Sequence, residues 1–218
     1  MAINVPRHLL YLQEECHSRG VEIVKARLPT NSGLASALRE AEQLLDRKSK
    51  PACFVNATGL AAGRLCSDAA VFPIRGQTVL VKGEARSTIT RAGEGYRAYC
   101  IPRPGSGTTI LGGTREENVW DETPDGEVTR RILERNAWQV PELLTGEAGG
   151  FEVLSVQCGL RPGRRGGVRL EGERVEGLRV VHAYGHAGAG YQNSVGSARE
   201  VVGLVGESLR AGGGLARL

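Results

Sequence analysis

The spacing of apolar residues changes from that of a strand to that of a helix between residues 178 and 205. A short apolar run comes first and is typical of a buried strand: Leu178, Val180, Val181 and Ala183. Apolar residues then return every three or four positions, as on one helix face: Val195, Ala198, Val201, Val202 and Val205. The pattern predicts a strand, a turn and a helix in that order.

Three glycines, Gly185, Gly188 and Gly190, fall in the predicted turn. Glycine adopts conformations that other residues avoid, and it lets a flat ligand lie directly against the main chain. The start of the following helix would offer free N–H groups and a partial positive charge to a phosphate or an electron-rich ring edge. A turn whose glycines serve only its own geometry explains the pattern equally well, because Gly-x-Gly alone is weak support for a ligand site.

Residues 1–66 mix helical and strand patterns, which is typical of an α/β layer. Asn4 as a cap and Pro6 in the first turn predict a helix that ends before Gly20. The other elements predicted here are a helix over 34–45 and strands at 21–28 and 52–56.

The turn Asn56-Ala-Thr-Gly59 follows the second of these strands. Ligands of α/β sheets lie at the carboxyl ends of strands, so Thr58 and Gly59 are candidate contacts for a phosphate or a ribose. An ordinary strand-to-helix turn explains the same residues equally well.

Residues 73–177 are richer in strand and hairpin signals, which predicts an antiparallel α+β layer. The predicted strands are 78–81, 98–102, 108–113, 151–160 and 168–170, and the predicted helix is 128–138. Residues 86–95 are polar and contain glycine, so we expect a mobile loop there. The fold class is therefore α/β plus α+β.

Composition narrows the functional classes. Net charge is only +4 and the basic residues are spread out, which argues against nucleic-acid binding. The longest apolar runs are far too short to span a membrane. The five cysteines lack a Cys-x-x-Cys pair and the four histidines lack ligand spacing, so we expect reduced thiols and no metal site.

Two motifs resemble a known family: His182-Ala-Tyr-Gly-His-Ala-Gly-Ala-Gly-Tyr-Gln192, and Gly159-Leu-Arg-Pro162 upstream of it. They are similar to the C-terminal part of the FAD-dependent D-amino-acid oxidases and D-aspartate oxidases. The resemblance implies FAD as the cofactor, with the glycine turn against the flavin ring. The cofactor-binding positions that it implies are Leu28 (through its backbone), Thr58, Gly59, Gly188, Gly190, Tyr191 and Gln192.

The same resemblance implies a substrate site. Arg161 would hold the substrate α-carboxylate, the Tyr99 hydroxyl would share it, and the Gly188 carbonyl would accept a hydrogen bond from the amine. The implied reaction is hydride transfer from the D-amino acid to flavin, followed by reoxidation with oxygen, and it needs no catalytic acid or base from the protein. Apart from the resemblance, an arginine at a turn and a tyrosine packed in a sheet explain these residues as well.

Arg115, in Leu111-Gly-Gly-Thr-Arg115, introduces an alternative activity. In D-aspartate oxidases an arginine at this place meets the side-chain carboxylate of an acidic substrate. A surface arginine paired with a nearby Glu or Asp explains Arg115 equally well. Tyr96 does not keep the family's spacing for a second tyrosine, so the residue of the active-site lid stays unassigned.

The resemblance covers only the C-terminal two-thirds of a family member, and the strand–Gly-x-Gly-x-x-Gly–helix fingerprint is absent. We expect a partial FAD-binding region (1–72), a substrate-binding sheet domain (73–177), a strand, turn and helix returning to the FAD region (178–210), and a tail (211–218).

Two expectations concern behaviour outside the site. This polypeptide alone should bind flavin weakly and be inactive, and the alternative is a non-catalytic remnant that self-associates, for instance as a homodimer. Ala216-Arg217-Leu218 resembles a peroxisomal address, and without it a cytoplasmic location is expected.

Overall fold

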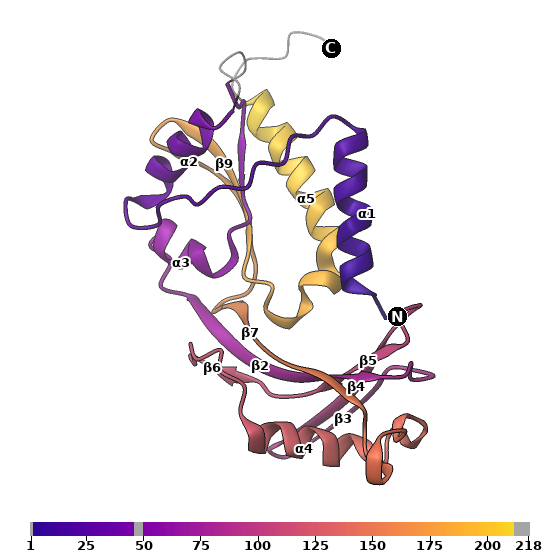
Figure 1. Cartoon of the computed structure of the whole chain (residues 1–218). Helices are drawn as coiled ribbons and strands as arrows, with labels where there is room; N and C mark the ends of the chain where they lie inside the picture. The colour runs from indigo at the N-terminus through magenta and orange to yellow at the C-terminus, as the bar shows by residue number, and fades with distance from the viewer. Residues whose placement is uncertain (1, 46–49, 212–218) are drawn as a thin grey trace. The chain divides into compact units, whose positions relative to one another are not determined.

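The computed structural model describes residues 2–45 and 50–211, and it divides the chain into two compact units (Figure 1). Unit 1 is Met1–Ile23 with Arg75–Leu160, and unit 2 is Val24–Ile74 with Arg161–Leu218. The division predicted from the sequence at 72/73 and 177/178 concerns cofactor and substrate layers and stays a prediction. Within the described ranges, no helix combines the length and the apolar character needed to cross a membrane.

A six-stranded sheet forms the framework of unit 1, in the order β3-β4-β5-β2-β6, with β7 paired to β2. Its strands are β2 (Val71–Lys82), β3 (Ile89–Gly93), β4 (Tyr96–Arg103), β5 (Thr108–Gly112), β6 (Glu116–Glu117) and β7 (Val153–Arg164). The outer ends of β2 and β7 continue into unit 2. The predicted hairpin around residues 103–107 is confirmed, because β4 and β5 pair antiparallel with Ile101 opposite Ile110.

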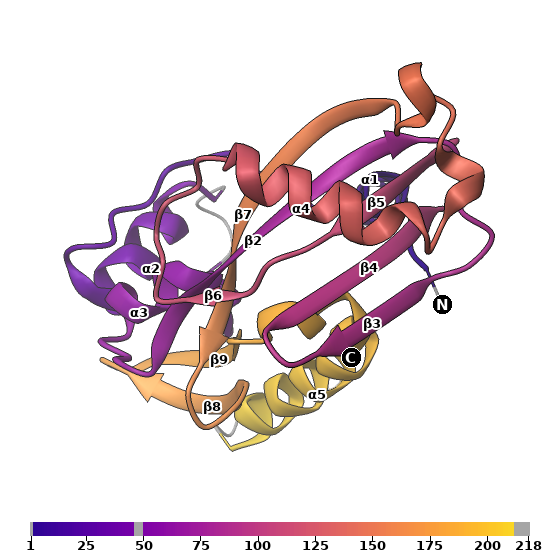
Figure 2. The ribbon, with the colours of Figure 1, turned by 90° about the horizontal axis from the view of Figure 1, so that it is seen from below.

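Helix α4 (Gly126–Ala137) crosses the sheet near β4 and β5, as Figure 2 shows. It begins at Asp125, whose side chain accepts a hydrogen bond from the Val128 amide, so the helix has a side-chain cap. Val128 and Ile132 face inward and pack with Val79 and Leu111 of the sheet. Short 3-10 turns follow at Pro141–Leu143 and Glu147–Gly149.

Helix α1 (Val5–Ser18) also belongs to unit 1 and confirms the helix predicted at the start of the chain. The Asn4 side chain accepts from the Arg7 amide and donates to the Pro104 carbonyl, 3.0 Å away. The helix ends at Arg19, and Gly20 follows with a φ of +71°. The helix is therefore capped as predicted and is tied to the β4–β5 turn at its start.

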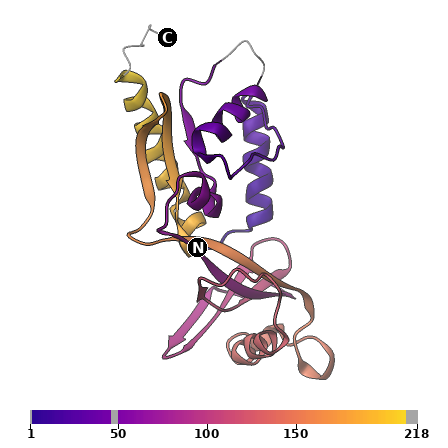
Figure 3. The same ribbon diagram turned by 90° about the vertical axis from the view of Figure 1, so that its left-hand side faces the viewer.

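Unit 2 contains a three-stranded sheet in the order β1-β9-β8. Its elements are α2 (Gly33–Gln43), β1 (Phe54–Asn56), a 3-10 turn (Gly59–Ala61), α3 (Ala62–Leu65), β8 (Arg169–Val175), β9 (Leu178–Tyr184), a second 3-10 turn (Ala187–Ala189) and α5 (Gly190–Arg210). β9 is central, parallel to β1 and antiparallel to β8. Figure 3 shows α5 along one face of β8 and β9, with α2 and α3 across the other. The mixed α/β character that we expected is confirmed.

Two of the predicted elements are wrong. Residues 21–28 form no strand, because β1 pairs only with β9 and no described strand offers residues 21–28 a backbone partner. Residues 86–95 are not a loop, because β3 pairs with β4 along its whole length and Gly95 turns the hairpin with a φ of +63°. In both cases the pairing partner, rather than local composition, decides the structure.

Candidate functional site

The glycine turn predicted between strand and helix is present between β9 and α5. Gly185 has a φ of +90°, and a Cβ there would lie 2.7 Å from the Cβ of Arg164. Only glycine suits both conditions without strain. An isolated antiparallel bridge between Gly163 and His186 then joins the end of β7 to this turn. The geometry of the chain itself therefore explains Gly185.

The geometry of the chain does not require glycine at Gly188 or Gly190. Neither has a φ in the left-handed region. A Cβ at Gly188 would meet only the Cδ of Arg161, and one at Gly190 only the Cβ of His186, both at an ordinary 3.9 Å. Side chains would fit both positions within the chain, so their absence leaves bare main chain exposed. Bare main chain before a helix whose start has no side-chain cap suits a flat, electron-rich ring such as flavin.

Helix α5 begins at Gly190, so Tyr191 and Gln192 lie in its first turn, and both are exposed. The apolar face predicted for this helix is only partly buried. Val201 and Val205 are half-buried, whereas Val195 and Val202 are 64% and 71% exposed. The helix therefore contacts the sheet along one narrow side and leaves its first turn accessible.

Arg161 lies near the end of β7 and is half-buried. Gly163, two residues later, could not carry a Cβ, because one would lie 2.9 Å from both Phe72 and Ile74. This close approach and the bridge to His186 bring β7 against the glycine turn, so the Arg161 stem lies beside Gly188. The two residues that the resemblance assigns to the substrate's acid and amine are neighbours in unit 2.

Tyr99 lies on β4 in unit 1, directly opposite Gly112 of β5. Its ring lies across the two glycines after Leu111, and a Cβ at Gly113 would be only 2.8 Å from the Tyr99 hydroxyl oxygen. The glycines therefore fix the direction of the ring. Tyr99 and Arg161 belong to different units, so their joint role in binding a carboxylate stays a prediction.

The turn after β1 is held together by its own residues. Buried Asn56 accepts hydrogen bonds through Oδ1 from the Thr58 amide (3.3 Å) and the Thr58 hydroxyl (2.7 Å). Gly59 has a φ of +59°, which favours glycine. The turn's own geometry therefore accounts for Thr58 and Gly59. Leu28 is half-buried but does not end a strand, so the strand end expected at that position is absent.

Asn56 also sets the protonation of His182, which is fully buried. Since Asn56 Oδ1 accepts from Thr58, its Nδ2 faces His182 Nδ1 at 3.1 Å, and the ring proton lies on Nε2. Nε2 then donates to Glu173, 3.0 Å away. Burial lowers the pKa of His182, so the ring is neutral near pH 7.

A second polar cluster in unit 2, centred on Asp68, escaped the sequence analysis. Its carboxylate accepts from the Tyr184 hydroxyl (2.9 Å), Arg164 Nε (2.8 Å) and the Ala70 amide (3.0 Å). Burial disfavours the charged form, but these hydrogen bonds outweigh it and lower the pKa of Asp68. Tyr184 is 116 residues away along the chain, so no local signal could have revealed the cluster.

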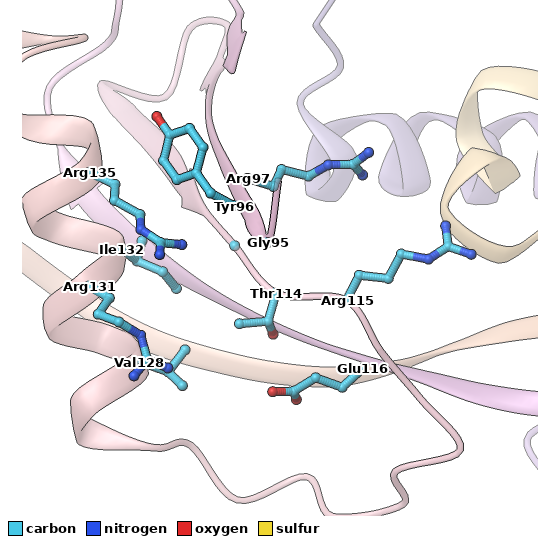
Figure 4. A pocket seen from close by; sticks show the side chains of 11 residues that line it. Gly95, Tyr96, Arg97, Thr114, Arg115, Glu116, Val128, Arg131, Ile132 and Arg135 are labelled. Atoms are coloured by element: carbon cyan, nitrogen blue, oxygen red, sulfur yellow. The ribbon is translucent and has the colours of Figure 1, made fainter. Parts of the chain in front are cut away.

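Arg115 extends from the segment after β5, is 52% exposed and pairs with Glu117 at 2.9 Å. It also lines a pocket of about 660 Å³ within unit 1, shown in Figure 4. The lining residues are Gly95, Tyr96, Arg97, Gly113, Thr114, Arg115, Glu116, Val128, Arg131, Ile132 and Arg135. The surface ion pair that we considered for Arg115 is present, and the pocket is a feature that the sequence analysis missed.

Comparison with known proteins identifies relatives across the chain. The sequence profile of the DAO family, described as FAD dependent oxidoreductase, matches residues 1–204. A D-amino-acid oxidase of Fusarium vanettenii is 36% identical over 213 residues, covering 94% of this chain and 57% of that protein. A D-aspartate oxidase of Talaromyces thermophilus is 37% identical over 206 residues, covering 94% and 52%. The chain thus spans about half the length of the curated relatives it matches.

Solved structures show a similar fold. Glycine oxidase from Geobacillus kaustophilus superposes with a TM-score of 0.59 at 24% identity, over 71% of this chain and 41% of that one. Glycine oxidase from Bacillus cereus gives the same TM-score over 72% and 43%. At this identity the similarity concerns the fold alone.

Proposed function

The chain belongs to the DAO family of FAD-dependent oxidoreductases, and we propose that it provides the substrate- and flavin-facing part of a D-amino-acid oxidase. The observation that carries this proposal is the Arg161 stem beside the bare main chain of Gly188. A cation and a main-chain carbonyl on neighbouring residues can bind the acid and the amine of one amino acid. The overall reaction would convert a D-amino acid, oxygen and water into a 2-oxo acid, ammonia and hydrogen peroxide.

The protein's part in this reaction is to bind and orient the substrate. The Arg161 guanidinium would hold the α-carboxylate through two parallel hydrogen bonds, and the Gly188 carbonyl would accept one from the amine. With both ends held, only one face of the substrate Cα can be presented to the cofactor, which selects the D-enantiomer. The Tyr99 hydroxyl would add a second donor to the carboxylate.

FAD would be held by the main chain around Gly188 and Gly190, by the first turn of α5 with Tyr191 and Gln192, and by Leu28, Thr58 and Gly59. The bound flavin supplies the two-electron acceptor that no side chain of the site provides. A site with fixed donors and acceptors, and without a general base, suits this division of labour.

The proposal is tested with the natural full-length protein supplied with FAD. We expect hydrogen peroxide from D-alanine and none from L-alanine, and Arg161→Met should lower kcat/KM about a hundredfold, because a charged hydrogen-bonding fork is lost. The control is Arg165→Met, an exposed arginine that stacks over Phe72 and should leave the rate unchanged. A flavin-loaded protein that is silent with every D-amino acid would refute the proposal.

D-aspartate oxidase is the second candidate, because Arg115 lines an arginine-rich pocket in unit 1. A second cation near the substrate would favour D-aspartate over D-alanine. Arg115→Leu should then raise KM for D-aspartate about tenfold and leave that for D-alanine unchanged. Equal effects on both substrates would leave Arg115 as the surface partner of Glu117.

Flavin affinity of this polypeptide alone is a separate proposal. We expect it to be weak, because the sequence holds no strand–Gly-x-Gly-x-x-Gly–helix to bind the pyrophosphate. Stoichiometric flavin absorbance after purification would contradict this expectation. Size-exclusion chromatography tests the rival idea of a self-associating, non-catalytic remnant, since a monomer that binds no hydrophobic dye argues against it.

A peroxisomal location is proposed from Ala216-Arg217-Leu218, which lie outside the described residues. A peroxide-producing oxidase suits that compartment. Removing the three residues from a fluorescent fusion should shift the protein to the cytoplasm, and an unchanged distribution would remove the support for this location.

A further inference from the structure

Two strand ends of unit 2 carry the groups that we assign to the amino acid. Arg161 lies near the end of β7, and Gly188 follows the end of β9 by four residues. The isolated bridge between Gly163 and His186 joins the backbones of these two ends. One bridge does not fix how far apart two strand ends lie along their length, so the spacing of the two binding groups depends on further contacts.

Asp68 joins the same two ends from a third segment, the loop between α3 and β2. Its Oδ2 accepts hydrogen bonds from Arg164 Nε at 2.8 Å and from the Tyr184 hydroxyl at 2.9 Å. Arg164 lies three residues after Arg161 on β7. Tyr184 is the last residue of β9, four residues before Gly188. One carboxylate oxygen therefore connects the strand that carries Arg161 to the strand that leads to Gly188.

The surroundings of Asp68 make this connection rigid. Its Oδ1 accepts from the Ala70 amide at 3.0 Å, and the Ala70 carbonyl accepts from the Arg165 amide at 2.9 Å, so the loop is also bonded to the backbone after β7. The stem of Arg164 lies so close to Gly185 that a Cβ there would be 2.7 Å from it. The Asp68 side chain is only 9% exposed, and water therefore competes little for its charge-assisted hydrogen bonds.

Stability alone is a weak reason for a buried ion pair, because the cost of desolvation offsets the attraction. The hydrogen bonds of Asp68 are directional, however, and they meet at the two strand ends that carry Arg161 and precede Gly188. The contribution of this carboxylate is therefore to the geometry of those ends.

We propose that Asp68 is a positioning residue that sets the separation between the Arg161 guanidinium and the Gly188 carbonyl. This inference rests on the proposed function, which assigns these two groups to the acid and the amine of the substrate. The two groups bind opposite ends of one small molecule, so a change of about 1 Å in their separation would loosen one end or turn the substrate Cα away from the cofactor. A ligand that uses only one of the groups would not be affected.

Kinetics of the natural full-length protein loaded with FAD test this role with Asp68→Asn, which keeps the shape but replaces one acceptor oxygen with an N–H donor. We expect kcat/KM for D-alanine to fall about tenfold. The inhibition constant of propionate, which has the carboxylate of alanine but no amine, should stay unchanged. Arg161→Met, by contrast, should weaken the binding of both molecules.

Two variants of unit 2 serve as controls. Glu176→Gln makes the same carboxylate-to-amide change in an exposed ion pair with Arg39, and Leu38→Ala opens a cavity in the core of the unit. Both should leave kcat/KM unchanged, although Leu38→Ala lowers stability. If Asp68→Asn does not fold, Arg164→Gln releases only the β7 end and should give the same selective loss with D-alanine.

Amide hydrogen exchange of the chain without substrate separates this inference from the oxidase assignment. Asp68→Asn should speed exchange about tenfold at two hydrogen-bonded amides near the joined ends, those of Arg165 and Ala189, and Glu176→Gln should not. Unchanged exchange, an unchanged kcat/KM for D-alanine, or equal losses for D-alanine and propionate would each overturn the positioning role. If the unaltered protein oxidises no D-amino acid, the oxidase proposal fails, and exchange still decides whether Asp68 holds the two ends.

Discussion

At the scale of single residues, His182 couples the stability of unit 2 to pH. Burial lowers the pKa of this histidine below its ordinary value of 6.5, so the unfolded chain takes up a proton more readily than the folded one. By linkage, the stability from the neutral ring is complete above about pH 6.5 and is lost as pH falls toward the lowered pKa.

We therefore expect the free energy of unfolding in urea to fall between about pH 7.5 and about pH 5.5, and to fall less in His182→Gln. His17→Gln is the control, because His17 is exposed. The same pH dependence in His182→Gln and in the unaltered protein would contradict the assignment.

Gly112 gives a second prediction at this scale. A Cβ at this position would overlap the Tyr99 ring, so Gly112→Ala must displace the ring. Overpacking of this kind costs about 1–3 kcal/mol. Thermal or urea unfolding should show this loss, whereas Gly126→Ala, where a Cβ meets nothing within 4 Å, should change little.

The sequence predicts part of the candidate site because some residues carry their own local motif. Arg161 before a proline and Gly188 within a glycine turn can be identified without a structure, and they prove to be neighbours. The pocket arginines cannot, because they come from the start of β4, the segment after β5 and one side of α4. Nothing local to these segments signals that they line one pocket.

At the scale of elements, Gln77 joins β2 to the start of α4. Its buried amide donates to the Asp125 carbonyl (2.7 Å) and the Thr129 hydroxyl (2.8 Å), and it accepts from the Asp125 amide (2.8 Å). Gln77→Met keeps the length but removes all three hydrogen bonds, and the Asp125 amide loses its acceptor. We expect a loss of about 1–3 kcal/mol in the free energy of unfolding.

Thr129→Val is the matched comparison, since it removes only one of these hydrogen bonds and should cost less than Gln77→Met. If the two substitutions cost the same in urea unfolding, Gln77 does not act as the joint between strand and helix.

Elements with strong local signals are predicted well, and those that depend on a partner are not. The cap at Asn4, the glycine at Gly20 and the apolar spacing in α4 each identify a helix from neighbouring residues. Residues 21–28 look like a strand but have no pairing partner among the described strands, and β3 looks like a loop but pairs with β4. Strand existence depends on pairing across the chain, which local composition does not reveal.

At the scale of the whole molecule, each unit has its own core but neither is a continuous piece of chain. The core of unit 1 gathers around Val79, Cys100 and Ile132, and that of unit 2 around Leu34, Leu65 and Val180. The chain passes from one unit to the other at residues 23/24, 74/75 and 160/161. A single cut in the sequence therefore cannot separate the two units.

The parallel pairing of β1 with β9 sets the order in which this protein can mature on the ribosome. Asn56 and His182 share a side-chain hydrogen bond although they are 126 positions apart in the sequence. During synthesis, β1 therefore has no pairing strand until β9 emerges from the exit tunnel. Nascent chains halted before residue 178 should thus be open to proteases around residues 54–56, and chains released after residue 184 should become resistant there.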